Sequence, residues 1–215
     1  MTFEAPEIVP ARQALERLRS GNQRFSSSVG AAAALPSHDR LRELADGQAP
    51  FAIILGCADS RVPAEIIFDQ GLGDLFVIRV AGNIVAPSQV GSVEFAAERF
   101  GTRLVVVLGH SQCGAITATL EELQRPQENQ SPNLRSIVDR VRPSVEPLLS
   151  SPLKNDLRAL AEEGVRANIR TSVEQLSHGS PILEKLIRES GVLVVGAEYS
   201  LETGVVTFFD ENLGR

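Results

Sequence analysis

The stretch Leu104-Val-Val-Val-Leu-Gly109 decides the fold class, because it is an unbroken apolar run rich in β-branched residues. Similar near-continuous apolar runs lie at 51–56, 75–80 and 192–197. Strands that are buried on both faces of a parallel sheet have this character. The sequence therefore predicts an α/β fold with a central, mostly parallel sheet of four strands and helices on both faces.

The end of the chain predicts one further strand. The segment 198–204 is typical of a hairpin turn, and it leads into Val205-Val-Thr-Phe-Phe209. A strand that returns through a short turn pairs antiparallel, so 205–209 is expected at an edge of the sheet. No linker or internal repeat divides the chain. Residues 1–215 are predicted to form one domain, with 1–45 as an N-terminal helical arm and 46–215 as the α/β core.

Helical patterns lie between the predicted strands. Ser88 is expected to cap a helix that ends near Gly101, and Ser180 a helix that ends at Gly191. A long packing helix is expected over 153–177, and a short one from Ser37 to Gly47 after a loop over 26–37. The N-terminal segment is amphipathic, with an apolar face formed by Ile8, Leu15, Leu18 and Phe25. We expect this face to pack across a partner subunit.

The chain has only two cysteines, and each follows an apolar run. The run 51–56 leads into Cys57-Ala-Asp59-Ser-Arg61, and the run 104–109 leads into His110-Ser-Gln-Cys113-Gly114. In open α/β sheets, ligands bind beyond the carboxyl ends of the strands, where both segments fall. Zinc prefers thiolate and imidazole, and a catalytic zinc keeps three protein ligands and an open position. Cys57, His110 and Cys113 are therefore the predicted zinc ligands.

Asp59 and Arg61 add an acid–cation pair to this predicted centre. Asp59 is close enough to Cys57 in the chain to reach the metal or a water on it, and Arg61 can hold Asp59 in a bidentate ion pair. No thiol or imidazole is evident as a fourth ligand, since His38 and His178 lie in polar stretches. We interpret the centre as a catalytic zinc whose fourth position is open, or closed by Asp59.

Simpler interpretations exist for each residue taken alone. A cysteine after an apolar strand is most often a small buried hydrophobe. The two cysteines could form a disulfide, His110 could be a core histidine, and Asp59 and Arg61 could form a surface ion pair of little energetic value. The combination of all four features at two strand ends favours the metal centre instead.

Composition limits the class of protein. The formal net charge is −6, and no tract rich in lysine and arginine is present, which argues against a nucleic-acid partner. No apolar run approaches the roughly 20 residues of a membrane span. The N-terminal residues lack the pattern of a secretion signal. With both cysteines assigned to the metal, the cytoplasm is the expected compartment.

The two motifs Cys57-x-Asp59-x-Arg61 and His110-x-x-Cys113-Gly114 resemble those of the β-class carbonic anhydrases. Further segments resemble the family in the expected order, among them 74–79, 81–83 and 91–95. The resemblance is to a bacterial member of the plant-type-like branch. It implies one Zn²⁺ per chain and reversible hydration of CO₂ to bicarbonate and a proton by attack of zinc-bound hydroxide on CO₂. It also implies that Asp59 and Arg61 are catalytic and that the Gly114 N–H binds the anion.

The same resemblance assigns a substrate cleft and an assembly. Gln48, Phe76 and Phe95 match its substrate-binding positions, although the two aromatics could equally be ordinary core residues. The family's pocket lies at a dimer interface, so a homodimer or a dimer of dimers is expected. The other branch carries a regulatory tryptophan where this chain has Ile54, and the chain contains no tryptophan.

Two alternative functions remain open from the sequence. A hydrolase of COS or CS₂ could use the same scaffold and the same nucleophile. A non-catalytic zinc-binding protein is less favoured, because the Asp59–Arg61 pair is intact.

Overall fold

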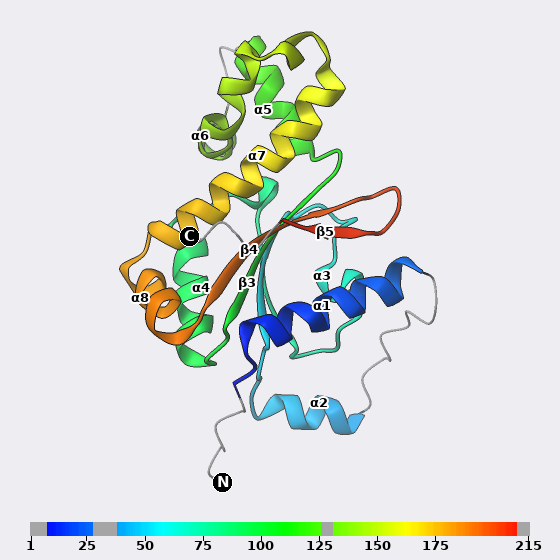
Figure 1. Cartoon of the computed structure of the whole chain (residues 1–215), viewed down its shortest axis with the longest axis vertical. Coiled ribbons are helices and arrows are strands. Elements are labelled where there is room, and N and C mark those ends of the chain that lie inside the picture. The colour runs from blue at the N-terminus through cyan, green and yellow to red at the C-terminus, as the bar shows by residue number, and fades with distance from the viewer. Residues whose placement is uncertain (1–7, 28–37, 126–130, 210–215) are drawn as a thin grey trace.

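The computed structural model describes residues 8–27, 38–125 and 131–209, which form one sheet with helices on both faces (Figure 1). Within this part of the chain the sheet has five strands in the order β2-β1-β3-β4-β5. The strands are β1 (Ala52–Gly56), β2 (Leu75–Arg79), β3 (Leu104–His110), β4 (Leu193–Tyr199) and β5 (Val206–Phe208). The first four pair in parallel and β5 pairs antiparallel with β4. The predicted mostly parallel sheet and its antiparallel edge strand are confirmed.

Alternate residues of the central strands enter two separate hydrophobic cores. Val105 and Val107 of β3 face the core beneath α4 (Pro87–Arg99), α7 (Leu157–His178) and α8 (Pro181–Ser190). Val106 and Leu108 face the core beneath α1 (Ala11–Ser26) and α3 (Ala64–Ile67). Every residue of β3 is buried, because both faces of the sheet are covered.

The remaining elements lie largely around the edge at which β1 and β3 end. A short 3₁₀ segment, η1 (Ala81–Asn83), follows β2, and α5 (Gly114–Gln124) follows β3. In Figure 1, α5, α6 (Pro132–Val145) and the first half of α7 extend beyond the sheet on that side. Two more 3₁₀ segments, η2 (Glu146–Ser150) and η3 (Pro152–Asn155), connect α6 to α7.

The prediction that the apolar face of α1 packs across a partner subunit is wrong in its premise. Leu15 and Leu18 are 1% and 0% exposed within the single chain. They pack against the sheet and α3, and Phe25 is partly buried beside them. Ile8 lies before the helix and is half exposed. The single chain therefore covers the apolar face of this helix with its own sheet and α3.

Helix boundaries agree with the sequence in part. Ser180 caps α8 by accepting from the Leu183 N–H, and Gly191 follows in the left-handed conformation, as predicted. Ser88 does not cap α4, which begins one residue earlier at Pro87. Proline is favoured at a first helical position because it lacks the N–H that a cap would satisfy.

The two other predicted helices also form. The long helix begins at Leu157 instead of 153, because Asp156 accepts from the N–H groups of Arg158 and Ala159 and caps it there. The short helix α2 spans His38–Ala45. The predicted start at Ser37 and most of the loop over 26–37 lie outside the described residues. No helix within the described ranges combines the length and apolarity that a membrane crossing requires.

Candidate metal centre

The adjacent strands β1 and β3 bring both motifs to one edge of the sheet. Gly56, the last residue of β1, lies opposite Leu108 of β3 in the register. Cys57 follows β1 directly, His110 is the last residue of β3, and Cys113 is the N-cap of α5. The ligand atoms of these three buried residues all lie within 4.8 Å of one another. The structure therefore brings together the three predicted zinc ligands.

The state of His110 shows that a cation fits among them. Its Nδ1 lies 2.9 Å from the Ser111 carbonyl oxygen, which can only accept, so the proton belongs on Nδ1. Nε2 is then a lone pair, and it is buried with no hydrogen-bond partner among the described residues. A buried imidazole nitrogen facing two thiol groups is what a zinc site of the Cys-His-Cys type requires.

The two thiols are electrostatically coupled. A hydrogen bond from Cys113, together with one from the Gly82 N–H, lowers the pKa of Cys57 to about 4. The Cys57 thiolate in turn raises the pKa of Cys113, and burial acts in the same direction. Backbone N–H groups of Ile116 and Ala115 at the start of α5 partly oppose this rise in the pKa of Cys113. A divalent cation between the sulfurs stabilises the thiolate form of both.

Asp59 and Arg61 form the bidentate pair expected from the sequence. Arg61 donates from Nε to Asp59 Oδ1 at 2.9 Å and from Nη2 to Oδ2 at 2.7 Å, and its backbone N–H donates to Oδ1 as well. These bonds hold the pKa of Asp59 well below its usual range. Oδ2 lies 3.9 Å from His110 Nε2. The Asp59 carboxylate thus lies at the border of the metal site, and Arg61 holds both of its oxygens.

Three hydrogen bonds to or from the backbone at the centre were not predicted from the sequence. Arg79, the last residue of β2, donates to the backbone carbonyls of both Cys57 and Asp59. The Gly82 N–H donates to Cys57 Sγ at 3.4 Å. The strand order could have indicated Arg79, which pairs with Gly56 in the register. No sequence pattern marks the bond from Gly82.

The predicted substrate-binding residues fall into two groups. Gly114 begins α5 directly beside Cys113, and an added Cβ there would meet open space. Gln48 is exposed and precedes β1, so the length of that strand separates it from Cys57. Phe76 lies on β2 opposite Ile53, and its ring packs 6.3 Å from that of Phe95 on α4. The single chain therefore places these three away from its own ligand cluster.

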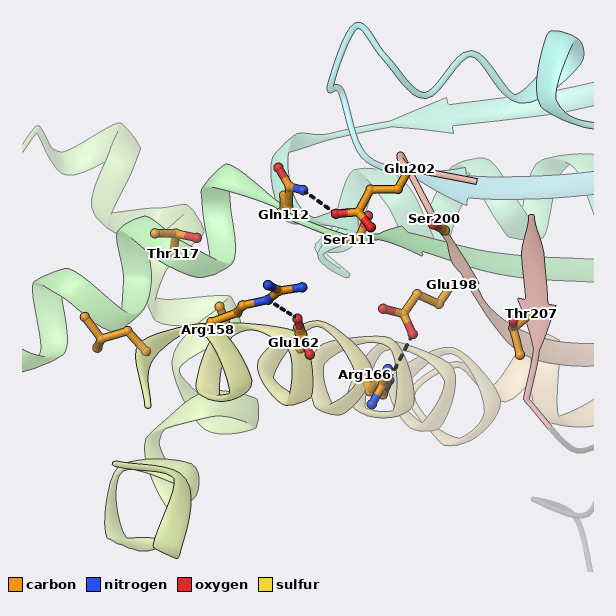
Figure 2. A pocket seen from close by; sticks show the side chains of 12 residues that line it. Ser111, Gln112, Thr117, Arg158, Glu162, Arg166, Glu198, Ser200, Glu202 and Thr207 are labelled. Atoms are coloured by element: carbon orange, nitrogen blue, oxygen red, sulfur yellow. Dashed lines mark hydrogen bonds and ion pairs between the residues drawn. The ribbon is translucent and has the colours of Figure 1, made fainter. Parts of the chain in front are cut away.

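A cavity of about 770 Å³ lies beside Ser111 and Gln112, which stand between His110 and Cys113 in the chain (Figure 2). Ser111 and Gln112 line one wall and the start of α7 lines another, whereas the three ligands do not line it. Its charges are paired internally, as Arg158 with Glu162 and Arg166 with Glu198. The cavity is therefore distinct from the metal centre.

Known proteins similar to this chain share one description. A family model described as carbonic anhydrase matches residues 52–206. Carbonic anhydrase 2 of Mycobacterium tuberculosis is 38% identical over 211 residues, covering 94% of this chain and 95% of the relative. A carbonic anhydrase of Mycolicibacterium smegmatis is 39% identical over 197 residues, covering 90% of each.

Solved structures give the same result. The β-carbonic anhydrase CcaA superposes with a TM-score of 0.71 at 27% identity, over 91% of this chain and 87% of that one. A structure from a study of two tetrameric β-carbonic anhydrases of Sordaria macrospora gives 0.70 at 25% identity, over 79% and 85%.

Proposed function

We propose roles for the individual site residues from the premise that this chain belongs to the carbonic anhydrase family, in its β class. The enzyme hydrates CO₂ to bicarbonate and a proton and uses one zinc ion per chain. The observation that carries the residue assignments is the buried cluster of Cys57, His110 and Cys113, with the Asp59–Arg61 pair at its border.

The metal would be held by Cys57 Sγ, His110 Nε2 and Cys113 Sγ. When bound there, zinc lowers the pKa of a water to about 7 and so supplies a hydroxide nucleophile at neutral pH. The carbonyl of Ser111 fixes the tautomer of His110. The Gly82 N–H donates to the Cys57 sulfur, and N–H groups at the start of α5 donate to the Cys113 sulfur. The protein thus keeps its three donors in the form that binds metal.

Asp59 orients the nucleophile in this proposal. Its carboxylate can only accept hydrogen bonds while it is ionised, and its pairing with Arg61 keeps it ionised. It therefore accepts the hydrogen of the attacking hydroxyl group and aims the lone pair away from itself, towards CO₂. Arg61 acts by holding both carboxylate oxygens of Asp59, which also prevents Asp59 from becoming a fourth metal ligand.

Gly114 is proposed to bind the product anion through its backbone N–H. It is the first residue of α5, where N–H groups are not used within the helix and the helix dipole favours negative charge. Space for the anion exists at this position, since an added Cβ would touch nothing within 4 Å.

Gln48, Phe76 and Phe95 are proposed to line the substrate cleft of the neighbouring subunit. The five residues of β1, which span about 16 Å at roughly 3.3 Å per residue, lie between Gln48 and Cys57 in the chain. Phe95 is 53% exposed and packs with Phe76 and Phe100, so an aromatic surface remains uncovered in the single chain. Ala49 and Pro50, which follow Gln48, line a small hollow with Phe100.

A symmetric dimer brings this surface of one chain to the metal centre of the other. In a two-fold interface the same patch serves both subunits, so each dimer contains two composite pockets. Gln48 would then donate to a CO₂ or bicarbonate oxygen, and the two aromatics would exclude water. We propose a homodimer or a dimer of dimers on this ground.

Mixing two impaired variants tests this composite pocket. Asp59→Asn damages the residue at the metal, and Gln48→Ala damages the residue from the partner. After subunit exchange, half of the dimers are mixed, and each mixed dimer contains one pocket with both native residues. CO₂ hydration is expected to rise to about a quarter of the wild-type rate.

The matched control mixes Asp59→Asn with Arg61→Ala. These residues pair within one chain, so a mixed dimer has no intact pocket and the rate is expected to stay low. If the first mixture also shows no rise once mass analysis has confirmed subunit exchange, Gln48 does not serve a partner's pocket.

We also infer a cytoplasmic location. Both cysteines are free in the structure and must be thiolates to bind metal. A reducing compartment preserves that state, whereas an oxidising one favours a disulfide.

A further inference from the structure

The 3₁₀ segment η1, next to Cys57, has an unusual backbone. Gly82 and Asn83 are consecutive residues in the left-handed region, with φ of 72° and 42°. Positive φ is uncommon for residues other than glycine, and asparagine is one of the few that adopt it readily. An added Cβ at Gly82 would lie 3.1 Å from the Ala115 Cβ, so this segment is tightly packed against α5.

Two side chains from α7 hold this backbone. Asn168 Nδ2 donates to the Gly82 carbonyl oxygen at 2.7 Å, and Ser172 Oγ donates to the Asn83 carbonyl oxygen at 3.1 Å. The two residues are four apart and therefore lie on the same face of α7. Each is only 2% exposed. Ser144 of α6 shares its hydroxyl hydrogen between the Val141 carbonyl oxygen at 2.6 Å and Asn168 Oδ1 at 3.2 Å.

The segment held in this way points a donor at a metal ligand. The N–H of Gly82 donates to Cys57 Sγ at 3.4 Å. Asn168 thus bonds the carbonyl of the same residue whose N–H reaches the sulfur. This contact path runs from α6 through α7 and η1 to the thiolate, and all its members are buried.

We propose that Asn168 is a positioning residue of the metal centre, which holds Gly82 so that its N–H donates to the metal-bound sulfur of Cys57. Asn168 touches neither metal nor substrate and acts through the backbone of Gly82. A hydrogen bond to a thiolate withdraws electron density from the sulfur. The metal then receives less charge from Cys57 and is the stronger Lewis acid. Ser172 supports the same geometry through Asn83.

The test measures metal binding and sulfur electronics in the full chain. Asn168→Leu is similar in size but cannot donate to the Gly82 carbonyl. Zn²⁺ dissociation constants from chelator competition at neutral pH are expected to rise about 10-fold, because Cys57 is no longer held in the ligand position and protons compete better for its thiolate. With Co²⁺ as the probe, the sulfur-to-metal charge-transfer band is expected to shift to lower energy, because the unbonded thiolate gives up electrons more easily.

A control separates this role from loss of a buried hydrogen bond in general. Thr102 is also buried and donates from Oγ1 to the Pro50 carbonyl at 2.8 Å, at the opposite end of the sheet. Thr102→Val is expected to lower the free energy of unfolding with no change in the Zn²⁺ dissociation constant or the Co²⁺ band.

Ser172→Ala keeps the test decisive if Asn168→Leu does not fold. It removes a single hydroxyl and is expected to move both readouts in the same direction by a smaller amount. An unchanged Co²⁺ band in the folded variants, with wild-type Zn²⁺ affinity, would overturn the proposal. The inference rests on the zinc assignment, which is tested separately by one Zn²⁺ per wild-type chain.

Discussion

At the scale of single residues, the Asp59–Arg61 pair matters for geometry more than for stability. Arg61 is about half exposed, and exposed ion pairs contribute little to the free energy of unfolding. Arg24 and Asp69 form a comparable pair away from the metal, at 2.5 Å between Nε and Oδ2. Only Asp59 lies beside a metal ligand, so equal changes to the two pairs are expected to differ in their effect on activity.

Asp59→Asn is expected to retain zinc and to lower kcat/KM for CO₂ hydration about 100-fold. An amide can donate to the nucleophile and misorient it, and residues that handle the reacting proton typically contribute factors of this size. Stopped-flow hydration assays with metal analysis provide the measurement. Asp69→Asn is the control and should have the wild-type rate; an active, zinc-loaded Asp59→Asn enzyme would exclude Asp59 from the mechanism.

Arg61→Ala is expected to retain zinc and to lose activity near neutral pH, most strongly on the acid side. Without Arg61 the pKa of Asp59 rises towards about 3.9, so the carboxylate remains ionised at neutrality and can ligate the metal. It then competes with hydroxide, which becomes scarcer as the pH falls. The acid limb of the kcat/KM profile should therefore move to higher pH, with recovery in alkaline solution. Arg24→Ala serves as the matched variant, and superimposable profiles for Arg61→Ala and wild type would show a structural role only.

At the scale of elements, the apolar residues of α1 and those around Phe95 of α4 differ in burial. The apolar face of α1 is buried on its own sheet, whereas Phe95 of α4 stays exposed. Interface formation is therefore expected through the surface around Phe95 instead of α1. The predicted arm is an integral layer of the single chain.

Leu18→Ala tests the position of α1. Leu18 is 0% exposed, so its truncation is expected to lower the free energy of unfolding by about 2–5 kcal/mol, while the subunit stoichiometry stays the same. Urea denaturation at saturating zinc and sedimentation measure the two quantities. Leu41→Ala, at a 45% exposed site on α2, should have little effect on stability. Dissociation of the oligomer by Leu18→Ala would instead restore the partner-packing interpretation of α1.

At the scale of the whole molecule, the metal joins segments that are distant in the sequence. Cys57 follows β1, Cys113 begins α5, and α6 and α7 reach the same centre through Ser144 and Asn168. A ligand that binds only the folded state stabilises it by mass action. Zinc is therefore expected to contribute to the stability of the entire domain.

Thermal unfolding should depend on free zinc concentration. At a free concentration of 100 times Kd, the stabilisation is expected to be about 2.7 kcal/mol, and chelation should remove it. Acidification should also remove it, because protons compete for the thiolates and for His110. Calorimetry over a series of zinc-buffered solutions measures the effect, and Cys57→Ser is expected to show little zinc dependence. An equal rise in melting temperature for Cys57→Ser would contradict the ligand assignment.

Local patterns in the sequence were enough to predict the sheet and the ligand set. Apolar runs define buried parallel strands, and ligands that directly follow two such strands meet at one edge because parallel strands end together. The cap at Ser180 also depends only on neighbouring residues and was predicted correctly. Ser88 does not cap its helix, because the helix already begins at Pro87.

The hydrogen bonds that support the site and the burial of α1 depend instead on how the elements pack. Arg79 and Asn168 donate to backbone carbonyl groups, and Gly82 donates from its backbone N–H. Every residue has a backbone carbonyl and nearly every residue an N–H, so no pattern of side chains predicts these contacts. An apolar helix face packs on whichever apolar surface the rest of the fold leaves available. Such choices depend on residues far apart in the chain, and they are settled only when the elements pack together.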